Sequence, residues 1–204
     1  SWDTTLKTAA AGGPYTLSVL GNGSCELKDV MLGEVWLCSG QSNMEWTPMA
    51  NIDNRDEEIA AADYPNIRFF HIPKRGATTP QNNCEASWAT CTPDVMKNTS
   101  AVAYFFGRNL QKDLNVPIGL IVSAWGGTPA EVWTPEERVM ENPQIRDAMP
   151  DKTYPWWPVE PGVLYNQMIN PIVPYSLAGA IWYQGESNRD HPDSYGILLK
   201  TMIE

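Results

Sequence analysis

The sequence has few residues of the kinds that hold metal ions. It contains two histidines and four cysteines in 204 residues, without a Cys-x-x-Cys pair or a histidine cluster among them. A zinc site, which needs several such ligands at short spacing, is therefore not expected. Long apolar runs are also missing. No segment is continuously apolar over the length that crosses a bilayer, and no signal peptide is recognisable.

Positive charge is scarce as well. Lys and Arg total 14 against 24 Asp and Glu, which gives a formal net charge of -10. Like charges repel, so this balance argues against a nucleic-acid partner and against an anionic membrane surface. Apolar residues, by contrast, make up 43% of the chain and include nine tryptophans. This composition predicts a globular protein with a sizeable core, and aromatic faces are common platforms for sugar rings.

The first part of the chain predicts a β-hairpin. Residues 14–20 and 25–30 have strand character on either side of a Gly-Asn-Gly turn. One hairpin cannot bury a face by itself. We therefore interpret residues 1–32 as the tail of an N-terminal β-rich domain. We interpret residues 33–204 as a second domain whose C-terminal part is missing, because the chain stops inside an apparent helix.

From residue 33 onward, apolar strands alternate with helical stretches. Runs that are apolar throughout fit parallel strands covered on both faces, and their alternation with helices predicts a doubly wound α/β sheet. Ser100 is expected to cap the clearest helix. The Pro- and Trp-rich segment 143–161 is expected to be an irregular, functional loop. The strands are expected at 35–38, 66–72, 118–123 and 177–183, and the helices near 55–63, 100–114, 135–142, 162–170 and 194–204.

Three of these strands end in polar loops, and a parallel sheet brings such loops to one edge. Residues 40–44 read Gly-Gln-Ser-Asn-Met, residues 125–128 Trp-Gly-Gly-Thr, and residues 182–188 Trp-Tyr-Gln-Gly-Glu-Ser-Asn. A serine hydroxyl, a backbone amide bared by glycines and a carboxamide are the equipment for acyl transfer. Ser42 is the first candidate for a nucleophile and Ser39 the second. The alternative is that Ser39, Ser42 and Asn43 only cap a helix.

The same three motifs, in this order, resemble those of the sialate O-acetylesterase family. That family belongs to the SGNH hydrolase group, which also includes acetylxylan esterases. The resemblance covers about residues 14–204 and implies a three-layer α/β/α sandwich with a flavodoxin-like parallel sheet. It also implies site residues. Ser42 would accept the acetyl group, the N–H groups of Ser42 and Gly127 would form the oxyanion hole, and Gln184 or Asn188 would supply a third donor. The substrate-binding residues would be Gln41, Trp125 and Glu186.

One part of the family pattern is absent. The group takes its general base from an Asp-x-x-His motif, and this sequence has none. His71, at the end of a strand, is expected to be structural. His191 follows the third motif and is the only alternative supplier, because a serine hydroxyl is a poor nucleophile without a base. We expect the base and its carboxylate partner to lie beyond Glu204, so that the 204 residues alone are nearly inactive.

The leading hypothesis is a carbohydrate O-acetylesterase that deacetylates sialic acid through an acetyl-Ser42 intermediate, without a metal or organic cofactor. A deacetylase of xylan or another polysaccharide is the second hypothesis. A non-catalytic carbohydrate-binding protein, with Trp125, Trp156 and Trp157 as stacking surfaces, is the third. Cys84 and Cys91 flank a short polar loop and would close a local disulfide in an oxidising compartment. Together with the resemblance, this favours a periplasmic or extracellular location.

Overall fold

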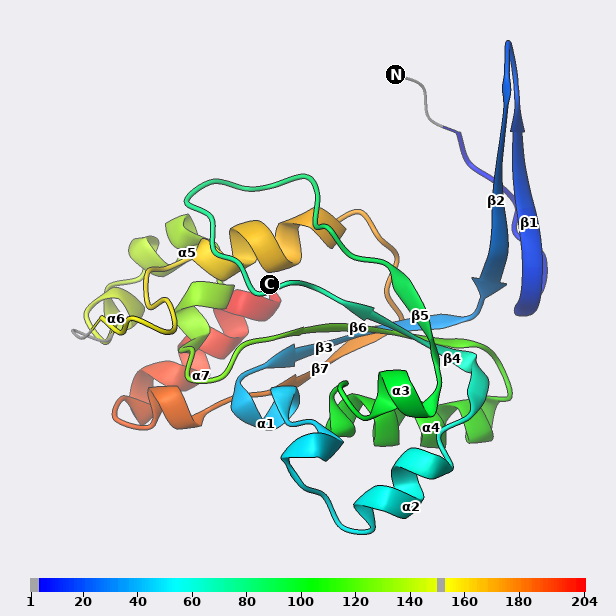
Figure 1. The fold of residues 1–204 in the computed structure, drawn as a ribbon. Coiled ribbons are helices and arrows are strands. Elements are labelled where there is room, and N and C mark those ends of the chain that lie inside the picture. The colour runs from blue at the N-terminus through cyan, green and yellow to red at the C-terminus, as the bar shows by residue number, and fades with distance from the viewer. Residues whose placement is uncertain (1–3, 150–152) are drawn as a thin grey trace.

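The computed structural model describes residues 4–149 and 153–204 and is built on a five-stranded sheet (Figure 1). The strand order is β5-β4-β6-β3-β7. Four strands run parallel, and the edge strand β5 runs antiparallel to β4. The predicted α/β class is confirmed. The strand order differs from that of flavodoxin. Along the chain β3, β4 and β6 are the first, second and third parallel strands, so their order in the sheet is 2-3-1, whereas a flavodoxin-like sheet starts in the order 2-1-3. The strands are β3 (Glu34–Gly40), β4 (Tyr64–His71), β5 (Trp88–Cys91), β6 (Ile118–Ala124) and β7 (Gly179–Tyr183).

The predicted hairpin is present as a separate two-stranded sheet. It consists of β1 (Gly12–Leu20) and β2 (Ser24–Leu32) and projects away from the α/β body in Figure 1. Most of its residues are exposed. The Arg68 guanidinium, on β4, donates two hydrogen bonds to the Asp29 carboxylate, at 2.7 and 2.9 Å. This two-pronged contact ties the hairpin to the central sheet.

Helices cover both faces of the sheet and complete the three predicted layers (Figure 1). One face carries α1 (Ser42–Glu45), α2 (Arg55–Ala60), α3 (Pro93–Met96) and α4 (Ala101–Leu114). The other carries α5 (Glu136–Glu141), α6 (Pro143–Arg146), α7 (Pro192–Ile203) and a π-helix, Tyr165–Ile169. Short 3₁₀-helices occupy Pro48–Ala50, Ala130–Trp133, Asn170–Ile172 and Glu186–Asn188. As predicted, Ser100 caps α4, because its hydroxyl accepts the Ala103 N–H at 3.1 Å.

The core is split between the two faces by the alternation of side chains along each strand. Leu120 and Ile121 are neighbours in β6, yet Leu120 packs with Tyr104 of α4, and Ile121 packs with Trp133 on the opposite face. All four of these side chains are buried. Strands buried on both faces need apolar residues at every position, which explains why β6 reads as one continuous apolar run.

The structure corrects three details of the sequence-based expectations. The helix expected at 162–170 is a π-helix followed by a 3₁₀-turn, because Pro171 has no N–H to continue an α-helix. The segment 143–161 contains α6 and is therefore partly regular; its residues 150–152 lie outside the described residues. Cys84 and Cys91 are both free thiols, and they pack in clusters on opposite faces of the sheet.

Candidate active site

The site lies at the edge where three parallel strands end side by side. Gly40, the last residue of β3, is level with Ala124 of β6 and Tyr183 of β7. A Cβ atom at Gly40 would lie 2.2 Å from the Tyr183 carbonyl oxygen, so only glycine allows the strands to pair here. The loops that follow the three strands therefore start from one place, as the sequence predicted.

Ser42 presents an accessible hydroxyl at this edge. It is the first residue of α1 and is exposed, and its hydroxyl makes no hydrogen bond to any residue that the structure describes. The N-cap of α1 is Gln41, without a side-chain capping bond, so a capping role for Ser42 is not observed. Ser39, the second candidate, is 4% exposed inside β3. Of the two serines, Ser42 alone is open to a substrate.

The first of the two glycines after β6, Gly126, packs directly against Ser42. A Cβ atom at Gly126 would lie 3.3 Å from the Ser42 Cβ. Gly127 has a φ of +82°, a left-handed conformation that favours glycine. Across residues 4–149 and 153–204, the Gly127 N–H has no acceptor. A backbone donor without a partner therefore lies one residue from the contact with the candidate nucleophile, as an oxyanion hole requires.

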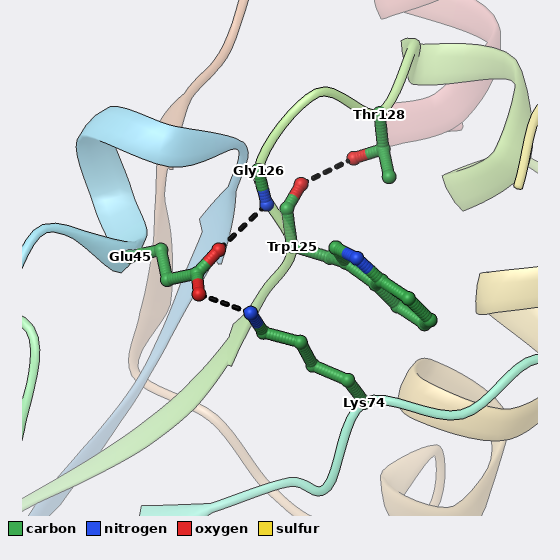
Figure 2. A network of polar contacts seen from close by, with 5 residues as sticks. All are labelled: Glu45, Lys74, Trp125, Gly126 and Thr128. Atoms are coloured by element: carbon green, nitrogen blue, oxygen red, sulfur yellow. Dashed lines mark hydrogen bonds and ion pairs between the residues drawn. The ribbon is translucent and has the colours of Figure 1, made fainter. Parts of the chain in front are cut away.

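The Gly126 N–H, in contrast, is already bound. It donates to the Glu45 carboxylate at 2.6 Å, and the other oxygen of Glu45 forms an ion pair with Lys74, which lies on the loop after β4 (Figure 2). No motif in the sequence singles out Glu45 or Lys74. Their contacts join segments 29 and 81 residues apart, and short-range patterns do not reveal such pairs.

Gln41 was predicted to bind substrate, but its side chain is directed into the protein. It is 3% exposed, and its Oε1 accepts the backbone N–H groups of Gly185 at 3.3 Å and Ser187 at 3.2 Å. These two residues belong to the loop after β7. Gln41 therefore connects the first predicted loop to the third one from inside the protein.

Gln184 and Asn188, the candidates for a third oxyanion donor, belong to one partly buried hydrogen-bond network. The Gln184 amide nitrogen donates to the Thr128 carbonyl at 3.2 Å and to Asn188 Oδ1 at 2.7 Å, which uses both of its hydrogens. Asn188 Nδ2 donates to Glu131 at 2.8 Å. Burial raises the pKa of the Glu131 carboxyl, while this hydrogen bond acts in the opposite direction. These bonds use both amide hydrogens of Gln184 and one of the two amide hydrogens of Asn188.

A cleft of about 480 Å³ opens beside Gly127. Tyr154 and Trp157 supply its aromatic surface, with ring centroids 4.8 Å apart, and Glu186 supplies a carboxylate that accepts a hydrogen bond from Asn43. Trp125 is not part of the cleft lining; it packs half-buried against the Ile121 and Trp133 cluster. Glu186 therefore lines the cleft, whereas Trp125 packs in the apolar cluster.

Neither histidine has the carboxylate partner of a catalytic base within the described part of the chain. The His71 ring nitrogen contacts the Thr99 hydroxyl at 2.6 Å, and burial lowers the pKa of the imidazole, which fits the structural role that was expected. His191 is exposed and lines the cleft. Among the described residues, no group of three or more His, Cys, Asp or Glu side chains could hold a metal ion.

The fold is a three-layer α/β/α sandwich, and an exposed serine and a free glycine amide lie near each other at one edge of its sheet. These features define the class of an esterase-like α/β domain. Residues 32–204 match the family model of the carbohydrate esterases described as sialic acid-specific acetylesterases. The chain belongs to this family.

Individual relatives agree with this assignment. The human sialate O-acetylesterase is 33% identical over 219 residues and the mouse one 33% identical over 247. Both alignments cover this whole chain, but only 42% and 45% of the relatives. The crystal structure of a carbohydrate acetylesterase from Xanthomonas citri shares 36% identity and superposes with a TM-score of 0.85, over 99% of this chain and 44% of that one. The chain thus spans less than half the length of these relatives.

Proposed function

We propose that the protein is a carbohydrate O-acetylesterase that removes acetyl groups from sialic acid through an acetyl-Ser42 intermediate. Family membership supports the reaction class. One observation carries the assignment to residues: the exposed Ser42 packs through its Cβ against Gly126, and the next residue, Gly127, has an unpartnered N–H and lines an aromatic cleft.

In this mechanism the Ser42 oxygen attacks the acetyl carbonyl carbon and loses its proton to a general base. The carbonyl oxygen becomes negative, and the N–H groups of Ser42 and Gly127 stabilise it. The sugar leaves as an alcohol after it receives a proton, and water then attacks acetyl-Ser42 to release acetate. Loss of one oxyanion donor typically lowers turnover by about 10²–10³-fold.

The general base is assigned to a part of the protein outside these 204 residues. Two facts support this assignment. Within the described ranges, neither His71 nor His191 is paired with a carboxylate, and the relatives are more than twice as long as this chain. His191 is the alternative, because it lines the cleft next to Gly127.

The cleft supports a sugar as the substrate. Tyr154 and Trp157 offer the flat faces on which sugar rings stack, and the cleft is wide enough for a single sugar residue. The surroundings do not favour one acetylated sugar over another, so sialic acid rests on the family alone. A periplasmic or extracellular location also rests on the family alone. The disulfide that would have supported it is absent, because all four cysteines are free. No helix among the described residues has the length and apolar character needed to cross a membrane.

The decisive experiment measures hydrolysis of 4-nitrophenyl acetate, O-acetylated sialic acid and acetylated xylan by the protein at its full natural length. Ser42→Ala should lower kcat by at least about 10³-fold on every ester that is cleaved. Ser18→Ala is the matched control, because Ser18 is an exposed serine on the distant hairpin. Unchanged activity of Ser42→Ala would overturn the assignment of the nucleophile. A folded protein that binds these sugars without cleaving them would instead be a carbohydrate-binding protein.

A further inference from the structure

The peptide unit between Trp125 and Gly126 is held at both of its polar ends (Figure 2). Its N–H, from Gly126, donates to Glu45 Oε2 at 2.6 Å. Its carbonyl, from Trp125, accepts the Thr128 hydroxyl at 2.7 Å. A peptide unit is planar, so two hydrogen bonds on opposite ends leave it little freedom to rotate. The next peptide unit along the chain carries the Gly127 N–H, the proposed oxyanion donor.

Glu45 connects the peptide unit between Trp125 and Gly126 to the candidate nucleophile, Ser42. It is the last residue of the four-residue helix α1, which starts with Ser42. A Cβ atom at Gly126 would lie 3.2 Å from Glu45 Oε2 and 3.3 Å from the Ser42 Cβ, so both side chains contact the same backbone segment. The short helix and the glycine loop are thereby held in one relative position.

Lys74 offsets the negative charge of the Glu45 carboxylate beside the proposed oxyanion hole. A negative charge close to an oxyanion hole opposes the negative charge that develops on the substrate. The Lys74 ammonium group pairs with the other oxygen of Glu45 and offsets that charge. The Glu45 side chain is 34% exposed and the Lys74 side chain 43%, so water screens the pair in part. An ionised acceptor also gives the Gly126 N–H a stronger hydrogen bond than a neutral one.

From these contacts we propose that Glu45 is a positioning residue, which holds the Gly126–Gly127 backbone so that the Gly127 N–H faces the oxygen of the attacked acetyl group. The proposal rests on the proposed esterase function. Glu45 does not touch the substrate in this scheme. It acts through Gly126, and Lys74 balances its charge. A displaced donor loses its benefit in the transition state and not in the bound substrate, so turnover should change more than affinity for the substrate.

The test measures kcat and KM for 4-nitrophenyl acetate with the protein at its full natural length. Glu45→Ala should lower kcat by about 10–100-fold, because the donor is displaced without being removed, and should leave KM within about threefold. Glu45→Gln retains an acceptor for the Gly126 N–H and should restore kcat to within about fivefold of the parent protein. Lys74→Met leaves that hydrogen bond in place and should have an intermediate effect. Glu57→Ala, an exposed glutamate on α2, is the matched control.

Inhibition by an alkylboronic acid gives a second readout that a purely structural role would not change. Such an acid forms a tetrahedral adduct with the serine and places an oxygen in the oxyanion hole. Glu45→Ala should weaken this inhibition about tenfold or more, in parallel with kcat. Thermal unfolding of each variant shows whether the fold is intact. If Glu45→Ala is unfolded, the kcat values of Glu45→Gln and Lys74→Met are compared instead. A higher kcat in Glu45→Gln than in Lys74→Met supports the role of Glu45, and the reverse order overturns it.

The outcomes separate this proposal from the proposed function. A kcat within about threefold of the parent in Glu45→Ala, while Ser42→Ala is inactive, overturns the role of Glu45 and leaves the esterase assignment intact. Equal losses in Glu45→Gln and Glu45→Ala also overturn it, because the acceptor would then be irrelevant. If Ser42→Ala retains full activity, the proposed function itself is wrong.

Discussion

Gln41 and Ser187 are joined across the edge of the sheet, because the buried Gln41 Oε1 accepts the Ser187 N–H at 3.2 Å. The same oxygen accepts the Gly185 N–H at 3.3 Å. One side chain at the end of β3 thus satisfies two backbone donors of the loop after β7. That loop also carries Glu186, which lines the cleft.

We expect Gln41→Ala to destabilise the protein by about 1–3 kcal/mol, since it leaves two partly buried backbone donors without an acceptor. Gln41→Glu retains an acceptor oxygen and should lose less stability at neutral pH. Urea denaturation measures both effects. Gln144→Ala, at an exposed glutamine, is the matched control. If Gln41→Ala were as stable as Gln144→Ala, the loop would be held by other contacts.

Glu131 should make the stability of the protein depend on pH. Burial raises the pKa of this carboxyl above its ordinary value of 4.5, while the Asn188 hydrogen bond and the charge of His191 act in the opposite direction. The native state therefore binds the Glu131 proton more tightly than the unfolded state does. It follows that this contribution to stability falls as the pH rises from about 4.5 through the native pKa, and is constant above it.

Glu131→Gln cannot titrate and should not show this fall. The measurement is the free energy of unfolding in urea for both proteins between about pH 4 and 8. The difference should move in favour of the variant as the pH rises. Asn188 still finds an acceptor, because the glutamine carbonyl replaces the carboxylate oxygen. A difference that is constant over this range would mean that Glu131 has the same pKa in both states.

The predicted elements with the strongest local signals are present in the structure. β3 and β6 are interior strands of the sheet and read as apolar runs, and α4 has both a serine cap and an apolar stripe. β5 was missed because it is a four-residue edge strand that is held by its pairing with β4 and not by its own pattern. The expected disulfide between Cys84 and Cys91 was wrong because it, too, depends on how distant segments are placed. Sequence spacing does not tell on which face of a sheet two cysteines lie.

The candidate site divides in a similar way. The meeting of Ser42 with Gly126 follows from parallel topology, which the alternation of strands and helices indicates. The roles of Gln41 and Gln184 could not be predicted, because a carboxamide serves equally well as a ligand to substrate or as a partner to backbone. Which of the two it does depends on neighbours that are distant in sequence. The roles of Glu45 and Lys74 could not be predicted either, because their contacts join residues that are distant in sequence.

A methyl group at Gly127 should disturb both the loop and the cleft. The φ of +82° disfavours any other residue, and the new Cβ would lie 2.6 Å from the Trp157 ring. We expect Gly127→Ala to lower stability by about 1–2 kcal/mol through backbone strain. It should also lower kcat by about 10²-fold, if the Gly127 N–H is an oxyanion donor.

A double-mutant cycle with Trp157→Ala separates the two causes. Removing the ring relieves the steric contact, so the double variant should regain part of the lost stability. It should not regain kcat, because the backbone donor stays displaced. Recovery of both quantities together would show that the contact with Trp157, and not the position of the N–H, causes the loss of activity.

The cysteines should behave as four separate thiols. In denaturant without any reductant, iodoacetamide should alkylate all four, which mass spectrometry counts directly. In the native protein the exposed Cys25 should react first. Burial raises the pKa of Cys38 to about 12 and that of Cys91 to about 11, so at neutral pH these two are protonated as well as shielded, and should react only when the protein unfolds. Cys25→Ser, which removes the fast thiol, is the control. Only two alkylated thiols in the unreduced, denatured protein would show a disulfide.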